Sequence, residues 1–305
     1  GTPDGSETLS VLPAEATSIY DAAGNAASNV TQSNNTSTLN DETAPTITGV
    51  ALAADNSTLT VTFSEDVYNT NVGSGNLEVT DFALAITGGT ATINQTPSTI
   101  TRTSQSEWDL GLDISGTPDG SETLSVVPAS ATSIYDLAGI AASTTQSNNT
   151  TTLNDKTVPT VTGVTGVNSN GTFGIGNLIG IQVNFSEVVT VNTSSGTPFI
   201  TLLTNTNTGV TTNVSYTSGS GSTTLEFDYT VASGDFSNNL DYSSTTSLSA
   251  NSGTIQDAGG NDATLTLATP GATNSLGANK EYIIGGIKAT FSSLSISEDN
   301  ILTVV

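Results

Sequence analysis

The chain repeats itself over the length of a whole domain, and this repetition limits its fold more than any other feature. The run from Gly1 to Val11 returns unchanged from Gly116 to Val126, and the match continues as far as residues 43 and 157. The two copies are offset by 115 residues, and by 114 after Ser28. Solenoid repeats are about 20 to 50 residues long, whereas one β-sandwich domain has about 100. We therefore expect each repeat to be a whole domain.

Composition and apolar spacing both favour β-structure. Thr, Ser, Asn, Gly and Val dominate the 305 residues, and long runs of good helix formers are absent. Apolar and polar residues alternate in short runs such as residues 57–63 and 224–231. Because alternation points one side of a strand into a core, we expect Trp108, Phe227 and Tyr229 to serve core packing rather than sugar stacking.

The second repeat has the strand count of an immunoglobulin-like sandwich. Turn residues separate about seven short antiparallel strands, expected at 46–52, 57–63, 82–86, 91–93, 108–114, 124–126 and toward Leu153. The sequence thus predicts an all-β fold of tandem immunoglobulin-like antiparallel β-sandwich domains in an elongated array.

Four segments follow from the repeat boundaries. We expect the C-terminal half of an immunoglobulin-like module at 1–43, a complete module at 44–157, a longer complete module at 158–284 and the opening strands of a further module at 285–305. Neither end segment can cover its own apolar face or pair its strand edges. We therefore expect a piece of a longer protein, whose ends are completed by neighbouring copies or by flanking repeats.

Charge and missing residue types exclude several classes of function. Four basic residues face 28 acidic ones, giving a net charge of −24 that repels nucleic acid and anionic bilayers. Without Cys or His, the chain has no disulfides, no thiolate zinc site and no histidine-based catalytic triad. No run approaches the roughly 20 apolar residues of a membrane span. We expect a protein that is not an enzyme, with neither nucleic acid nor a membrane span among its interactions.

Three acidic landmarks recur at the module boundaries. An Asp-x-x-Gly turn occurs at Asp21, Asp136 and Asp257, and a Phe-Ser-Glu strand ending occurs at Glu65 and Glu187. Each joint between modules carries an aspartate four residues before a proline, and these aspartates are Asp41 and Asp155. Proline favours an extended linker that enters an edge strand.

The antiparallel order of strands brings these landmarks together. The second strand of a module returns to the pole where the first began, and the turn before the last strand lies at the same pole. Oxygen ligands without His or Cys suit Ca²⁺. We therefore predict structural Ca²⁺ at the joints, with candidate ligands Asp21, Asp41, Glu65, Asp66, Asp136, Asp155, Glu187 and Asp257. Individually these carboxylates could instead make Asx turns or be solvated, and Asp235 with Asp241 forms a less favoured second site.

The order and spacing of these landmarks resemble the bacterial immunoglobulin-like repeats of very large secreted adhesins and surface-layer proteins. The resemblance covers essentially the whole chain and implies a structural role at the bacterial cell surface, as a stalk or filament shaft stiffened by Ca²⁺. It also implies that any surface glycan or host protein is bound by other regions. Departures are Ile140 where Asn is usual, Gln256 where the other copies have Tyr, and a last joint at 279–282 without Asp or Pro.

Two other functions stay open from the sequence. A carbohydrate- or protein-binding module would need an exposed aromatic cluster, which the alternating pattern does not indicate. Accessory domains of a secreted polysaccharide hydrolase need no histidine, because glycosidases act through two carboxylates. An enzyme should have one unrepeated site, however, and here the distinctive acidic residues recur with the module.

Overall fold

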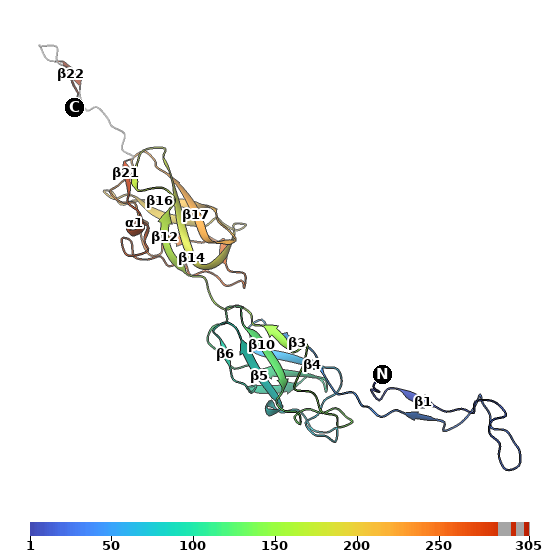
Figure 1. Ribbon diagram of the computed structural model, residues 1–305. Helices are drawn as coiled ribbons and strands as arrows, with labels where there is room; N and C mark the ends of the chain where they lie inside the picture. Colours follow the sequence, from blue (N-terminus) through green and yellow to red (C-terminus); the bar gives the residue numbers. More distant parts are fainter. Residues whose placement is uncertain (286–293, 297–301, 305) are drawn as a thin grey trace. The chain divides into compact units, whose positions relative to one another are not determined.

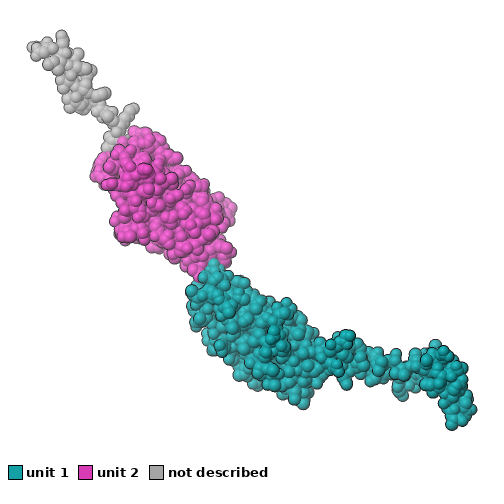
Figure 2. All heavy atoms as spheres, in the orientation of Figure 1, with its two compact units in different colours: residues 1–155 teal, residues 156–305 magenta. Residues whose placement is uncertain are grey.

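The computed structural model describes residues 1–285, 294–296 and 302–304, and its regular structure is almost entirely β (Figure 1). The chain divides into two compact units, Gly1–Asp155 and Lys156–Val305 (Figure 2). Across the described residues, no helix is long and apolar enough to cross a membrane. The all-β prediction is therefore confirmed.

The first unit contains two principal antiparallel sheets. One has the order β3-β4-β8-β7 and the other the order β11-β10-β5, while β6 pairs with β9 and β1 pairs with β2. The elements are β1 (Thr8–Ser10), β2 (Thr36–Thr38), β3 (Ile47–Leu52), β4 (Thr58–Phe63), the 3-10 turn η1 (Val79–Asp81), β5 (Phe82–Thr87), β6 (Thr92–Ile93), β7 (Thr99–Arg102), β8 (Glu107–Gly111), β9 (Ile114–Ser115), β10 (Thr123–Pro128) and β11 (Thr150–Thr152).

Alternate residues of these two sheets form one core. Leu59 and Val61 of β4, Trp108 of β8 and Leu124 and Val126 of β10 belong to a single cluster of buried side chains. Burying each such side chain contributes about 1.5–3 kcal/mol. The alternation of apolar and polar residues thus directs one side of these strands into the core between the sheets, as predicted.

Two features of this unit differ from the expected strands. The run expected at 108–114 is divided, because β8 pairs with β4 and β7 only as far as Gly111, and β9 then pairs with β6. Strand β7 was not expected at all. Three of its four residues are exposed, so it lacks the apolar alternation that identifies a half-buried strand.

The second unit has one larger, mixed sheet system. Its strands follow the order β12-β14-β17-β16-β15-β18-β21-β13, with β19 paired to β15 and β20 paired to β14. The elements are β12 (Val161–Gly166), β13 (Gly171–Phe173), β14 (Leu178–Asn192), β15 (Phe199–Asn205), β16 (Val210–Ser218), β17 (Ser222–Thr230), β18 (Phe236–Ser237), β19 (Leu248–Ser249), β20 (Thr254–Gln256), the short helix α1 (Leu276–Asn279) and β21 (Tyr282–Gly285).

The core of the second unit includes the aromatic residues expected there. Phe227 and Tyr229 of β17 are buried in one cluster with Ile181 and Val183 of β14. Pairing is not purely antiparallel, since β13 runs parallel to β21 and β15 parallel to β18. Strand β14 also continues past Glu187, where a strand end was expected. A register shift between Asn184 and Val189 lets its last residues leave β17 and pair with β20.

The end of the chain contributes a further strand pair. Strand β22 (Leu294–Ile296) pairs antiparallel with β23 (Leu302–Val304). These strands fall where the sequence predicts the opening hairpin of another module. The turn expected at residues 299–300 lies outside the described residues.

Candidate metal centre

The Phe-Ser-Glu sequence of the first unit fastens the incoming linker and leads to an acidic side chain. Phe63 is buried in the core, and Ser64 makes two hydrogen bonds with the residue that follows the linker proline. The Ser64 amide donates to the Thr46 carbonyl at 2.8 Å, and the Thr46 amide donates to the Ser64 hydroxyl at 3.0 Å. Glu65, the next residue, is consequently held at the entrance of β3 and is half-buried.

The Asp136 turn is fixed by its own backbone and by a close approach to a neighbouring loop. The Ile140 amide donates to Oδ1 of Asp136 at 2.7 Å, and the Asp136 amide donates to the Ile140 carbonyl at 3.0 Å. Gly139 has a φ of +87°, and a side chain there would lie 2.4 Å from the Asn71 carbonyl oxygen. Only glycine fits this turn, which directs the carboxylate of Asp136 inward, where it is completely buried.

Asp41 reaches the same place from the linker. The Thr43 amide donates to its Oδ1 at 2.9 Å, and the Glu42 amide donates to the Pro3 carbonyl at 2.9 Å. These bonds hold the linker in a defined turn before Pro45. Asp41, Glu65 and Asp136 each offer a carboxylate oxygen, and the three oxygens lie within 4.8 Å of one another.

The second oxygen of Asp136 is the distinctive feature of this group. Oδ2 is buried and accepts no hydrogen bond from the described residues. In the two other copies of the turn, an asparagine side chain donates to the corresponding oxygen at 2.9 Å, Asn25 to Asp21 and Asn261 to Asp257. Module two has Ile140 at that position, so its aspartate lacks the amide donor. An uncompensated buried oxygen of this kind costs about 1–3 kcal/mol.

Electrostatics at the group favour a positive partner. Burial, followed by the negative charges of Asp136 and Asp41, raises the pKa of Glu65 from 4.5 to about 7. A carboxyl group retains its proton in this way when no cation offsets the neighbouring charges. Three carboxylates with no His or Cys form a hard oxygen donor set, which fits Ca²⁺ better than zinc or copper.

The second unit repeats part of the arrangement. Glu187 and Asp257 present carboxylate oxygens within 4.8 Å of each other, and Asp257 is buried. The pair of serine hydrogen bonds is also repeated. The Ser186 amide donates to the Thr160 carbonyl at 2.8 Å, and the Thr160 amide donates to the Ser186 hydroxyl at 3.0 Å. Asp155 is the last residue of the first unit, and its role beside this pair stays a prediction.

Two predicted ligands lie outside these groups. Asp66 is exposed, although its charge helps to raise the pKa of Glu65. Asp21 is exposed, and its oxygens are taken by the amides of Ala23 and Asn25 and by the Asn25 side chain.

The less favoured pair, Asp235 and Asp241, has protein partners. Oδ2 of Asp235 accepts hydrogen bonds from the Tyr229 hydroxyl at 2.6 Å and the Ala232 amide at 2.7 Å. Asp241 accepts from the amides of Tyr242 and Gly271. Both carboxylates therefore stabilise loops of the second unit.

The sequence reasoning missed one buried carboxylate, Glu122. Its Oε1 accepts hydrogen bonds from the amides of Thr90 and Ala91, and its Oε2 accepts from the Asp119 amide. This side chain joins the turn after β5 to the loop before β10. Apolar spacing gives no signal for it, because its partners are backbone amides, and those of Thr90 and Ala91 are distant in sequence.

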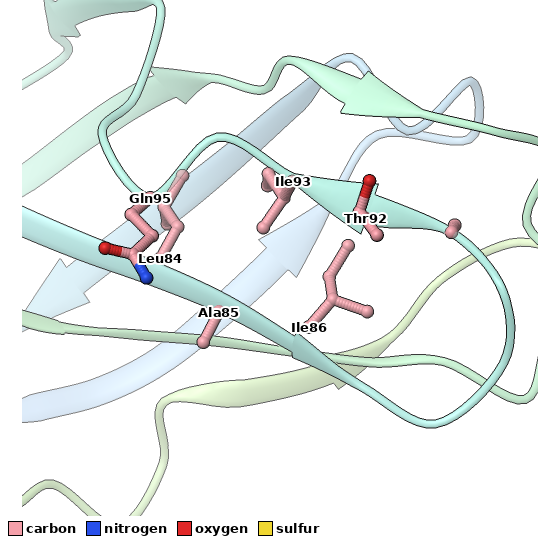
Figure 3. Close-up of a pocket in the computed structure, with 7 residues that line it drawn as sticks. Leu84, Ala85, Ile86, Thr92, Ile93 and Gln95 are labelled. Carbon is pink, nitrogen blue, oxygen red and sulfur yellow. The ribbon is translucent and has the colours of Figure 1, made fainter.

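One small pocket within the described residues has a lining that suits neither catalysis nor sugar stacking. This pocket of about 180 Å³ lies between β5 and the segment around β6, where Leu84, Ile86, Ile93 and Gln95 line it (Figure 3). None of its lining residues is titratable. Tyr20 is the one aromatic residue among the exposed large hydrophobic side chains of the described chain.

No family model and no curated protein matches the chain. Two solved structures share distant similarity with it, namely the crystal structure of the S-layer protein rSbsC(31-844) and the structure of domains 1–6 of surface layer protein SbsC. The sequence identities are 14% and 10%, and the matches cover 85% and 86% of this chain with TM-scores of 0.26 and 0.27. The chain spans 28% and 57% of the lengths of those two proteins. At these scores the similarity carries no conclusion about fold or function.

Proposed function

We propose that the chain is a structural repeat region of a bacterial cell-surface protein, a stalk or filament shaft whose immunoglobulin-like modules are stiffened by Ca²⁺ at their joints. The observation that carries the proposal is the buried, unpartnered Oδ2 of Asp136 beside Asp41 and Glu65. A cation there would bind the linker and two loops of the following module at once.

Three features support a mechanical role over catalysis or glycan binding. The acidic positions recur with the module, whereas a catalytic centre is expected once. The two hydrogen bonds between Ser64 and Thr46 fix the start of the strand that follows the linker. A cation held by Asp41 would add a second attachment between the linker and this module. Buried aromatic residues and a single exposed tyrosine offer no stacking platform for glycans among the described residues.

Calorimetric titration of the chelator-treated chain tests the metal site directly. We expect Ca²⁺ to bind, and Glu65→Gln to weaken the binding at this joint by at least about tenfold, because it removes a charged ligand. Asp66→Asn is the matched control, since this adjacent carboxylate lies outside the group. Equal weakening by both variants would indicate general screening of the acidic surface rather than a site.

Small-angle scattering with and without Ca²⁺ tests the mechanical role separately. We expect the maximum dimension to become better defined when Ca²⁺ is added. Calcium binding without any change in the scattering curve would retain the metal site and reject the stiffening.

A further inference from the structure

Residues 1–43 form an open half-module whose apolar side has no cover in the described structure. Leu9 and Val11 are 53% and 65% exposed, whereas their counterparts in module two, Leu124 and Val126, are 0% exposed. Ile19 is 55% exposed and its counterpart Ile134 is fully buried. The same side chains thus form a core in one copy and a surface in the other.

The half-module nevertheless has the internal structure of its complete counterpart. Strand β1 pairs with β2 in the register Thr8 to Thr38, and β10 pairs with β11 in the equivalent register Thr123 to Thr152. An asparagine side chain donates to the carbonyl of the central valine in both copies, Asn35 to Val11 and Asn149 to Val126, each at 2.9 Å. The surface is therefore preformed.

Module two shows what covers this surface when the module is complete. The free edge of β1 corresponds to the edge of β10 that pairs with β5, where Leu124 lies opposite Ile86 and Val126 opposite Leu84. A groove of about 420 Å³ lined by Val11, Leu12 and Ile19 lies beside β1. The counterparts of Val11 and Ile19 in module two are buried against the first half of that module.

Polar groups of the half-module also match contacts that module two makes with its own first half. In module two Gln146 accepts a hydrogen bond from the Ile47 amide at 2.8 Å, and Oε1 of Glu122 accepts from the Thr90 and Ala91 amides. Their counterparts are Gln32 and Glu7. Glu7 keeps the internal bond from the Asp4 amide to Oε2 at 3.1 Å, as Glu122 does from Asp119.

We propose that residues 1–43 are an acceptor site for one occupant, a flanking repeat segment with the sequence chemistry of residues 44–115. The donor supplies an alternating apolar strand equivalent to β5 to the free edge of β1, a turn whose amides bind Glu7, and an opening strand whose amide binds Gln32. Two half-modules packed against each other would lack these amides, because the counterparts of Thr90, Ala91 and Ile47 lie in the donor segment and not in residues 1–43. This inference does not depend on the metal site.

The test is amide hydrogen exchange on two forms of the full chain. One form is the chain itself, and the other carries a second copy of residues 44–115 joined directly before Gly1, which recreates the natural junction between Ser115 and Gly116. We expect the amides of Thr8, Ser10 and Tyr20 to exchange about a hundredfold more slowly in the extended form, because their counterparts Thr123 and Ser125 pair with β5 and Tyr135 donates to Tyr68. The matched control places Leu84→Asp in the added copy alone and should abolish that protection.

Each other outcome overturns the proposal. Unprotected amides in the extended form would show that the half-module does not accept the donor. Protection that survives Leu84→Asp would show that the β5 register is not what covers the surface. Protection in the unextended chain, with a dimeric mass in light scattering, would assign the surface to a second copy instead.

Discussion

Replacing Asp136 with asparagine should stabilise the module when Ca²⁺ is absent and destabilise it when Ca²⁺ is present. In chelator, Asp136→Asn keeps an oxygen to accept from the Ile140 amide and replaces the unpartnered Oδ2 by an amide that can donate to Glu65 or Asp41. Removing the buried charge and the unsatisfied oxygen should stabilise the metal-free module by about 1–3 kcal/mol. At about 4 °C per kcal/mol for a domain of this size, the melting temperature rises by roughly 4–12 °C.

With Ca²⁺ present, the native chain should be more stable than Asp136→Asn. Calcium at about 1,000 times its dissociation constant stabilises the native module by about 4.1 kcal/mol, which exceeds the roughly 1–3 kcal/mol gained by the variant, and the variant loses that contribution. Trp108 is the only tryptophan and is buried in this module, so its fluorescence reports the melting of this unit alone.

Asp21→Asn is the matched control for Asp136→Asn. Asp21 occupies the same position in an exposed turn whose oxygens already have amide partners, so its replacement should change the melting temperature little in either buffer. A variant of Asp136 that is less stable than the native chain in chelator, or that keeps the full calcium shift, would refute the reasoning.

Four further predictions concern Glu65, Ile140 and Glu122. The pKa of Glu65 is raised from 4.5 to about 7, so between pH 4.5 and 7 the folded chain retains a proton that the unfolded chain has lost. The free energy of unfolding of the metal-free chain, measured with urea, should therefore fall as pH rises through this range. Calcium must displace that proton, so calorimetry should find binding about tenfold weaker at pH 6 than at pH 8. Ile140→Asn should restore the amide donor of the other two turns and stabilise the metal-free module by about 1 kcal/mol, seen as a higher melting temperature in chelator. Glu122→Ala should leave buried amides unpaired and cost about 2–4 kcal/mol in urea unfolding, while Glu7→Ala, its exposed counterpart, should cost less than about 0.5 kcal/mol.

Much of the fold could be predicted because alternation and repetition are local signals. The spacing of Leu59, Val61 and Phe63 identified β4, and the alternation of Phe227 and Tyr229 identified β17. Strand β7 escaped because three of its four residues are exposed. The length of β14 escaped because its continuation depends on a change of partner from β17 to β20, which no local pattern encodes.

The candidate site followed from topology rather than from any single motif. Strand direction alone placed Asp41, Glu65 and Asp136 at one pole, and the structure brings their oxygens within 4.8 Å. That they hold a cation stays a prediction. The sequence did show Ile140 as a departure from the usual asparagine, but its consequence, an unpartnered Oδ2 on Asp136, required the geometry of the turn.

A crystal structure of the chain grown with Ca²⁺ would test the central claim most directly. We predict an ion at about 2.3–2.6 Å from Oδ2 of Asp136, with oxygens of Asp41 and Glu65 in the same coordination sphere and anomalous signal at its position. An Asp136 oxygen bound only by water, with Asp41 and Glu65 turned away from it, would contradict the account.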